Sequence, residues 1–260
     1  MSPKNLNATI KIPKLLKKKL NNLRVNEIYN NFEKSLKIKE SFAVAVSGGP
    51  DSLALAFLAK VYSEKNKILS KFLIIDHRLR PESTKEAKLV KNTLKKYSIN
   101  AEILTWRGKK PKKNIQSYAR NKRYDLLINK CRKLKINNIL LGHHQDDLLE
   151  NFFIRIFRGS GLKGLVSLET ENKVSNLNFL RPLLYQKKED LVFVSNKIFD
   201  FYVRDPSNED EKFLRIKIRK LIKDFEKSDI DKSKFISTIK NLKSSNNVVD
   251  FYTNKNLDKN

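Results

Sequence analysis

The chain has 260 residues, 40% of them hydrophobic, and a formal net charge of +27 from 55 Lys and Arg against 28 Asp and Glu. This length suffices for a full α/β domain with a small appendage, and the lone Cys131 excludes a disulfide framework and any Cys-x-x-Cys metal or redox site. No apolar run approaches the ~20 residues that cross a bilayer, and the first residues contain no signal-peptide core, so we expect a soluble, cytoplasmic protein without a membrane partner.

The positive charge is concentrated in one part of the chain. Residues 107–135 contain twelve Lys and Arg against the single acid Asp125, whereas residues 221–260 contain eight Lys against six acids. A bias in genome composition would spread the charge evenly. The concentration therefore favours a polyanionic partner, with nucleic acid ahead of a membrane surface.

The first two thirds of the chain alternate between short apolar runs and longer helical stretches. Residues 1–40 are expected to form a helical extension, because apolar residues recur at roughly helical spacing from Leu16 to Ile28. The predicted strands are 42–46, 72–75, 101–105 and 138–141, and the predicted helices between them lie near 52–65, 83–97 and 115–134. This order is typical of an α/β, Rossmann-like, doubly wound fold with a mainly parallel sheet covered on both faces.

Beyond residue 141 the order of elements changes. We expect a helix over 143–157, a glycine-rich turn and an irregular stretch, followed by helices near 187–200 and 209–225. The predicted organisation is an N-terminal helical extension (1–40), an α/β domain (41–185), a small C-terminal helical part (186–245) and a flexible tail (246–260).

The most informative motif is Ser47-Gly48-Gly49-Pro50-Asp51-Ser52, which follows directly on the apolar run 42–46. It predicts a strand, a tight glycine turn and a helix start, an arrangement that presents backbone N–H groups to a phosphate. Glycines let the main chain approach an anion, proline suits the first helical position, and serines add hydroxyl donors. An ordinary strand–turn–helix corner is the alternative interpretation, and a Walker A sequence is absent.

Asp51 is the unexpected member of this loop, because a carboxylate beside a phosphate is repulsive unless a cation lies between them. We therefore expect Asp51 to hold Mg²⁺. Polar clusters at 47–52, 76–80 and 142–150 each follow the end of a predicted strand. In open parallel sheets ligands bind beyond those ends, so the three clusters are expected to converge on one rim.

The third cluster runs from Gly142 to Glu150 and opens a predicted helix. On a helix His143 lies beside Asp147, and Asp146 beside Glu150, because residues four apart share a face. Acids in a first helical turn also suit the helix dipole, so capping is the alternative role for Asp146. Carboxylates that face a phosphate loop suit Mg²⁺ better than a zinc site.

A glycine-rich segment, Gly159-Ser160-Gly161-Leu162-Lys163-Gly164, matches the pattern of dinucleotide-binding loops. It follows a predicted helix rather than a strand, so the required context is missing. We therefore interpret it as a helix stop and a loop.

Several segments together carry a resemblance to known proteins. They are Ser47–Ser52, Asp76-His77-Arg78-Leu79-Arg80, Asn114-Ile115-Gln116, Ala119-Arg120, Arg123-Tyr124, Gly142–Asp147 with Glu150, Arg158–Gly161, Gly164-Leu165 and Arg181–Leu184. In this order they resemble the PP-loop ATP pyrophosphatase superfamily and, within it, the tRNA(Ile)-lysidine synthetase family. The loop marks only the superfamily, whereas the His-His-x-Asp-Asp helix followed by Arg-Gly-Ser-Gly is much more specific.

The resemblance implies an ATP-dependent ligase that forms a carbon–nitrogen bond. In that family ATP adenylates the C2 oxygen of the wobble cytidine 34 in an isoleucine tRNA with a CAU anticodon, and pyrophosphate leaves. The ε-amine of free L-lysine then displaces AMP, which gives lysidine and changes codon reading from AUG to AUA. Residues 41–185 would be the PP-loop ATP-binding catalytic domain.

The resemblance also implies roles for individual residues. The loop 47–52 would bind ATP, and Asp51 and Asp147 would hold Mg²⁺ and act in catalysis together with Arg120. Residues assigned to lysine or cytidine are His143, Asp146 and Glu150. Residues assigned to tRNA or phosphate contacts are Arg80, Lys112, Lys113, Arg123, Arg215 and Arg219.

Plainer roles compete for some of these residues. A solvated helix face is the alternative for Arg120 and Arg123, and Tyr124 could stack on a splayed base but is more often a core residue. Three positions depart from the family pattern: Arg78 for a usual glycine, Asn151 for threonine and Ile216 for asparagine. Many relatives also have a larger C-terminal tRNA-binding region, so positive charge on the catalytic domain is expected to compensate in part.

Three other functions compete with this interpretation. A tRNA thiolase of the same superfamily needs cysteine pairs or an iron–sulfur cluster, which one cysteine cannot supply. A PP-loop amide synthetase would not need the basic segment 107–135. A non-catalytic RNA-binding module would not need the acids, because carboxylates repel RNA.

Overall fold

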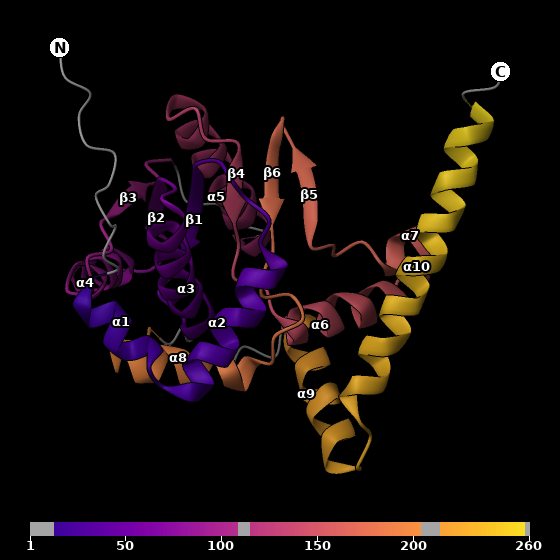
Figure 1. The fold of residues 1–260 in the computed structure, drawn as a ribbon. Coiled ribbons are helices and arrows are strands. Elements are labelled where there is room, and N and C mark those ends of the chain that lie inside the picture. The colour runs from indigo at the N-terminus through magenta and orange to yellow at the C-terminus, as the bar shows by residue number, and fades with distance from the viewer. Residues whose placement is uncertain (1–12, 109–114, 204–213, 258–260) are drawn as a thin grey trace, which may run out of the picture. The chain divides into compact units, whose positions relative to one another are not determined.

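The computed structural model describes residues 13–108, 115–203 and 214–257, which fall into two compact units (Figure 1). Unit 1 comprises Met1–Gly142 and Glu171–Arg204, and unit 2 comprises His143–Thr170 and Asp205–Asn260. Within the described ranges, no helix combines the length and apolar character that spanning a bilayer requires.

Unit 1 is built, in its described residues, on a six-stranded sheet with the order β3-β2-β1-β4-β6-β5. The strands are β1 (Phe42–Val46), β2 (Ser70–Asp76), β3 (Ala101–Thr105), β4 (Asn138–Leu140), β5 (Glu171–Val174) and β6 (Leu177–Leu180). Neighbours from β3 to β6 run parallel, and β5 pairs antiparallel with β6 at the edge. Parallel neighbours need crossover connections, which are α3 (Pro50–Asn66), α4 (Ser83–Lys95) and α5 (Ile115–Lys133). The predicted doubly wound α/β fold is confirmed.

Both faces of the sheet are buried, which explains why its strands are continuous apolar runs. Along β1, Phe42, Val44 and Val46 join one core, while Ala43 belongs to the core on the opposite face, because alternate residues of a strand project to opposite sides. The first core includes residues of α3, α4 and α8 (Lys188–Phe199), and the second includes Leu127 of α5. Figure 1 shows α8 beside α3.

The N-terminal helices α1 (Lys14–Leu20) and α2 (Leu23–Ser35) share the first core. Phe32 is fully buried, and its ring meets Tyr62 of α3 edge to face at 6.1 Å between centroids. The hydroxyl of Tyr62 lies 2.8 Å from the carbonyl oxygen of Ile38 and donates to it. The described part of the predicted extension is therefore helical and is an integral part of unit 1.

Residues 171–180 form the β5–β6 hairpin, although the sequence predicted an irregular stretch there. Ser175 and Asn176 make its two-residue turn with φ of 50° and 64°, values that suit the twist of a tight hairpin. The strands were missed because each has four residues and β5 reads Glu-Asn-Lys-Val, which carries almost no apolar pattern.

Unit 2 consists, as far as it is described, of α6 (Gln145–Ile156), α7 (Leu162–Leu165), α9 (Leu214–Lys227) and α10 (Lys232–Leu257). Phe153, Phe225 and Phe235 form an aromatic cluster with ring centroids 5.3–5.8 Å apart. Helices α6 and α7 thus belong to unit 2, whereas the sequence analysis placed their residues in the domain 41–185.

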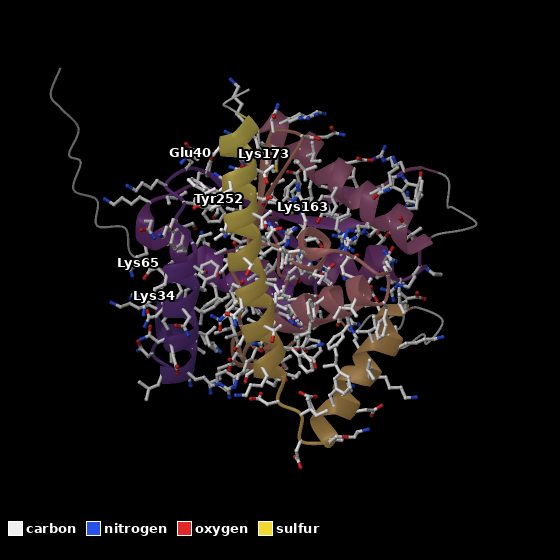
Figure 2. All side chains as sticks on the ribbon, turned by 90° about the vertical axis from the view of Figure 1, so that its right-hand side faces the viewer. Lys34, Glu40, Lys65, Lys163, Lys173 and Tyr252 are labelled. Atoms are coloured by element: carbon white, nitrogen blue, oxygen red, sulfur yellow. The ribbon has the colours of Figure 1, made fainter. Side chains whose placement is uncertain are left out.

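Helix α10 continues to Leu257, although a flexible tail was predicted from residue 246. The side chains themselves support this helix, because Asn246 Nδ2 donates to Asp250 Oδ2 at 2.7 Å and Thr253 Oγ1 donates to Val249 O at 2.8 Å. Its last turns carry exposed apolar side chains such as Tyr252, which is 58% exposed (Figure 2). The abundance of asparagine there, a poor helix former, hid the helix from the sequence analysis.

Candidate nucleotide-binding and catalytic site

The loop from Ser47 to Ser52 joins β1 to α3 and is closed by one hydroxyl group. Ser52 Oγ accepts the backbone N–H groups of Ser47 and Gly48, each at 3.1 Å, and donates to Gly49 O at 2.9 Å. Gly49 caps α3 and Pro50 begins it. The first N–H groups of a helix have no partner within the helix, and the positive end of its dipole attracts anions. The loop has the shape of an anion-binding corner, and its binding of ATP stays a prediction.

Two glycines allow the chain to pack closely around this loop. Gly48 has a φ of +91°, and a Cβ there would lie 2.6 Å from Val90 Cγ2 and 3.2 Å from Val203 Cγ2. Gly142 follows β4, and a Cβ there would lie 3.3 Å from the backbone of Asp51. The end of β4 is therefore packed directly against the first turn of α3, where Asp51 lies.

Asp76 ends β2 and supports the start of α4. Its carboxylate is 2% exposed and accepts hydrogen bonds from Arg78 N at 3.0 Å, Ser83 Oγ at 2.9 Å and Thr84 Oγ1 at 2.7 Å. Three donors satisfy this buried carboxylate, so the first acid of the Asp-His-Arg-Leu-Arg segment stabilises the turn between β2 and α4.

His77, the next residue, is half-buried and uncharged at neutral pH. Burial and the nearby Arg123 guanidinium lower the pKa of His77 to about 4, although Asp76 acts in the opposite direction. Among the described residues, neither ring nitrogen has a hydrogen-bond partner. A neutral imidazole has one donor and one acceptor, so His77 can bond to a polar ligand at this rim.

Helix α6 opens with a capping box made by His144 and by Asp147, which belongs to the predicted site. His144 Nδ1 accepts the N–H of Asp146 at 3.2 Å, and Asp147 Oδ2 accepts the N–H of His144 at 3.1 Å. Burial alone would raise the pKa of Asp147, but His144 and His143 outweigh it, so the pKa lies below its ordinary value. Asp147 is therefore ionised at neutral pH. Asp146 also lies in the first turn of α6, where an acid suits the helix dipole, while the capping box itself is made by His144 and Asp147.

Glu150 is 1% exposed and holds two arginines of α9. Arg219 Nε lies 2.5 Å from Glu150 Oε1, and Arg215 Nε lies 3.0 Å from Glu150 Oε2. Burial raises the pKa of Glu150 and Arg219 opposes this, while the carboxylate raises the pKa of Arg219. A guanidinium does not lose its proton at neutral pH, so both arginines stay charged beside Glu150. In the structure Glu150 binds arginines, and its contact with lysine stays a prediction.

Asp146 already faces an ammonium group. Lys232 Nζ, at the start of α10, lies 3.5 Å from Asp146 Oδ1 and 2.5 Å from Glu226 Oε1. Because free lysine carries the same group at its α-carbon, the contact shows that an ammonium fits beside Asp146.

The basic residues that were predicted to act in catalysis or to contact tRNA or phosphate lie in different surroundings. Arg120 lies over the ring of Tyr124 with its guanidinium carbon 5.4 Å from the centroid, and Arg80 forms a 2.8 Å ion pair with Glu86. The Tyr124 ring is partly buried and packs against the second core, with its centroid 4.9 Å from that of Phe179. Lys112 and Lys113 lie outside the described residues.

The donor chemistry of the predicted metal ligands fits Mg²⁺. Carboxylate oxygens are hard ligands, and proteins commonly hold this ion with one or two carboxylates while substrate phosphates supply further oxygens. Within the described part of the chain, no group of three or more His, Cys, Asp or Glu is arranged to hold a metal ion. Asp51 belongs to unit 1 and Asp147 to unit 2, so their joint ligation stays a prediction.

The glycine-rich segment after α6 is a helix stop, as predicted. Gly159 has a φ of +67° and donates to Ile156 O at 2.9 Å, and Ser160 N donates to Arg155 O at 3.0 Å. Such bonds satisfy the last carbonyl groups of a helix. The segment connects α6 to α7 and does not follow a strand.

Three residues at or near these clusters were not predicted from the sequence. His144 was visible in principle, because an acid three residues after a polar side chain is a capping signal, but histidine is an unusual cap. Lys232 lies 86 residues from Asp146, and no local pattern links them. Trp106 follows β3 and is only 9% exposed, and its backbone N–H donates to Asp76 O at 2.9 Å.

Comparison with known proteins places these observations in a family. A model of the PP-loop domain matches residues 17–225. The chain is 42% identical over 207 residues to the tRNA(Ile)-lysidine synthase of Orientia tsutsugamushi, covering 78% of this chain and 46% of that protein. It is 34% identical over 232 residues to the same enzyme of the Wolbachia of Brugia malayi, covering 87% and 51%.

Among solved structures, the U34-tRNA thiolase NcsA from Methanococcus maripaludis, with its [4Fe-4S] cluster, matches with a TM-score of 0.72. The match covers 84% of this chain and 78% of that one at 16% identity, and it shows a shared fold alone. The chain spans about half the length of the curated relatives it matches. The family match covers most of the chain, and the glycine loop lies within it; the chain belongs to the PP-loop domain family.

Proposed function

We propose that this protein is an ATP-dependent ligase that joins L-lysine to C2 of the wobble cytidine in an isoleucine tRNA with a CAU anticodon. The observation that carries the proposal is its 42% identity over 207 residues to a curated tRNA(Ile)-lysidine synthase. The PP-loop family model matches residues 17–225, and the loop 47–52 leads into the N-terminus of α3, where a helix attracts anions.

In the first step the loop 47–52 binds the phosphates of ATP, and the cytidine O2 attacks the α-phosphorus. A phosphorus–oxygen bond forms to O2, and the bond to pyrophosphate breaks. Negative charge builds up on the leaving pyrophosphate, and the N-terminal dipole of α3 stabilises it. Asp51 and Asp147 would hold Mg²⁺, which would supply further charge neutralisation at this step.

In the second step the ε-amine of lysine attacks C2, a carbon–nitrogen bond forms, and AMP leaves with the oxygen. Asp146 holds the α-ammonium group of lysine, a role supported by its contact with the ammonium of Lys232.

Glu150 orients Arg215 and Arg219, whose guanidinium groups suit phosphate oxygens of tRNA or of the leaving AMP. Arg120 and Arg123 bind phosphate from the first turns of α5. ATP, tRNA and free lysine meet in the cytoplasm, where we place the enzyme.

A thiolase-type reaction is not favoured, although the fold resembles a thiolase. That relative carries a [4Fe-4S] cluster, which cysteine thiolates hold. The sequence here has one cysteine, and burial raises the pKa of Cys131 to about 11, which keeps its thiol protonated and unreactive.

The test is to incubate the protein with ATP, labelled L-lysine and a transcript of the CAU-anticodon tRNA, and to identify the product nucleoside by mass. We expect lysidine, with AMP and pyrophosphate in equal amounts. A transcript with uridine at the wobble position should not be labelled.

The matched variants are Asp51→Ala and Glu40→Ala, because Glu40 is an exposed acid outside the loop. Asp51→Ala should lower lysidine formation on the order of 10²–10³-fold with an unchanged melting temperature, and Glu40→Ala should retain activity. Near-normal turnover in Asp51→Ala would refute the metal assignment, and absence of labelled lysine in the wild-type reaction would refute the proposed function.

A further inference from the structure

A separate pocket of about 330 Å³ lies in unit 1, beyond the carboxyl ends of β2 and β3. Its lining includes Arg78, Arg80, Thr84, Trp106, Arg107 and Gly108, and we refer to it as the arginine pocket. As far as the described residues go, the loop 47–52 contributes nothing to this lining. The pocket is at the lower end of the size range for small-ligand sites.

The charge of the arginine pocket is unusual for this chain. The sequence has 13 arginines among its 55 basic residues, and three of them line this one pocket. A guanidinium is a planar fork that binds phosphate oxygens in pairs, whereas the ammonium of lysine acts as a point charge. Glu86 pairs with Arg80, but in the described structure no carboxylate lies within ion-pair distance of Arg78 or Arg107.

Arg78 occupies a backbone position that disfavours a side chain. Its φ is +52°, in the left-handed region where L-residues other than glycine are strained. Such strain is kept where the surrounding structure or a function requires the side chain. Here the strained residue places a third guanidinium in the arginine pocket.

Trp106 and Gly108 give the pocket a rigid wall. The indole of Trp106 meets the Tyr118 ring edge to face at 5.5 Å, and a Cβ on Gly108 would lie 2.5 Å from the indole Nε1. The chain can therefore pass over the indole only with glycine at position 108. An aromatic wall beside cationic groups suits a nucleotide, because the sugar and base pack on the ring while the arginines hold the phosphate.

We propose that the arginine pocket binds one phosphodiester-linked nucleotide of the tRNA substrate, apart from the ATP site. This rests on the proposed function for the identity of the RNA, but the pocket's chemistry requires only an RNA phosphate with its nucleoside. Arg78, Arg80 and Arg107 hold the phosphate, and Trp106 contacts the sugar or base. The pocket thus adds an RNA contact beyond the carboxyl ends of β2 and of the edge strand β3.

The experiment uses Trp106 as its own reporter, because it is the only tryptophan in the sequence. Intrinsic fluorescence is followed while CAU-anticodon tRNA, AMP or ATP with Mg²⁺ is added, and tRNA affinity is measured over a range of salt concentrations. The pocket variant is Arg78→Gly with Arg107→Ala. The control, Lys91→Ala with Lys95→Ala, removes two exposed charges from α4.

We expect tRNA to change the Trp106 emission, with AMP and ATP leaving it unchanged. The pocket variant should bind tRNA about tenfold more weakly, and the slope of log affinity against log salt should fall by about 1–2 relative to wild type. The control variant should keep the wild-type slope. Because Arg78→Gly relieves backbone strain, the pocket variant should also melt no lower than wild type, which separates a lost contact from a lost fold.

Other results would overturn the proposal. If tRNA affinity and slope are the same in the pocket variant and wild type, or if wild type binds no tRNA, the pocket is not an RNA site. If ATP affinity falls while tRNA affinity is kept, the pocket belongs to the nucleotide site instead. If the pocket variant loses tRNA affinity but wild type makes no lysidine, the pocket stands and the proposed function fails.

Discussion

Adding one methyl group at Gly48 tests how closely the chain packs around the loop 47–52. Gly48→Ala would place a Cβ 2.6 Å from Val90 at a φ of +91°, so we expect the free energy of unfolding to fall by about 1–3 kcal/mol. Gly49→Ala is the matched control, since the nearest atom would be Ser47 Oγ at 3.7 Å, and its effect should stay within roughly 0.5 kcal/mol. Urea unfolding of both variants checks this, and equal midpoints would contradict the close packing around Gly48.

His77 makes stability depend on pH in a known direction. Its folded-state pKa of about 4 lies below the ordinary 6.5, so the unfolded chain binds the proton first as the pH falls. The stability contributed by the neutral imidazole is complete above pH 6.5 and is lost as the pH falls from 6.5 towards 4.

Melting temperatures of wild type and His77→Asn, compared at about pH 7 and about pH 5, measure this contribution. We expect the wild type to lose more stability on acidification than the variant, because asparagine does not titrate. Parallel losses in both proteins would show that His77 is not the titrating group.

Helices α6 and α9 are joined by the ion pairs of Glu150 with Arg215 and Arg219. Glu150→Ala leaves the guanidinium groups of Arg215 and Arg219 without their buried partner. We expect a loss of about 1–3 kcal/mol, less than for a wholly buried ion pair, because the two arginines are 41% and 32% exposed.

The same variant distinguishes two roles of Glu150. A positioning role predicts lower stability and a lower kcat with little change in the KM for lysine, and Glu150→Gln should restore part of the stability. Direct contact with lysine predicts the reverse: a raised KM for lysine in both variants and an unchanged unfolding midpoint. Unfolding curves and lysine titrations on the same samples decide between them.

At the scale of the whole molecule, positive charge is spread over many elements and is densest in one segment. Exposed lysines such as Lys34, Lys65, Lys163 and Lys173 come from α2, α3, α7 and β5 (Figure 2). The sequence 107–135 carries the highest local charge, and part of it, 109–114, lies outside the described residues.

We predict that the lysines of this segment act together on tRNA. Changing Lys109, Lys110, Lys112 and Lys113 to alanine should weaken tRNA binding and lower the salt slope by up to about 3–4, since each phosphate contact contributes roughly 0.7–0.9. The control changes four exposed lysines elsewhere: Lys37, Lys39, Lys91 and Lys95. An equal loss in both quadruple variants would show that only total charge matters.

Much of unit 1 could be predicted because its signals are local. The strands β1 and β3 have the bounds that the sequence predicted, and the glycine pair after β1 marks the turn into α3. A buried strand, a glycine turn and a helix that starts at proline each depend on residues only a few positions apart, so the sequence alone indicates them. The β5–β6 hairpin was not predicted because its strands are short and β5 is mostly polar, and the end of α10 was not predicted because asparagine is abundant there.

The sequence by itself therefore determined the fold class, the family and the chemical types present at the site. Only the tertiary structure decided which distant groups meet: Glu150 with Arg219 across 69 positions, Asp146 with Lys232 across 86, and three arginines around one pocket. It also divided the chain into two units, each of which combines two segments that are separate in the sequence. Local periodicity encodes which face of an element is buried, but the pairing of faces depends on the packing of all elements together.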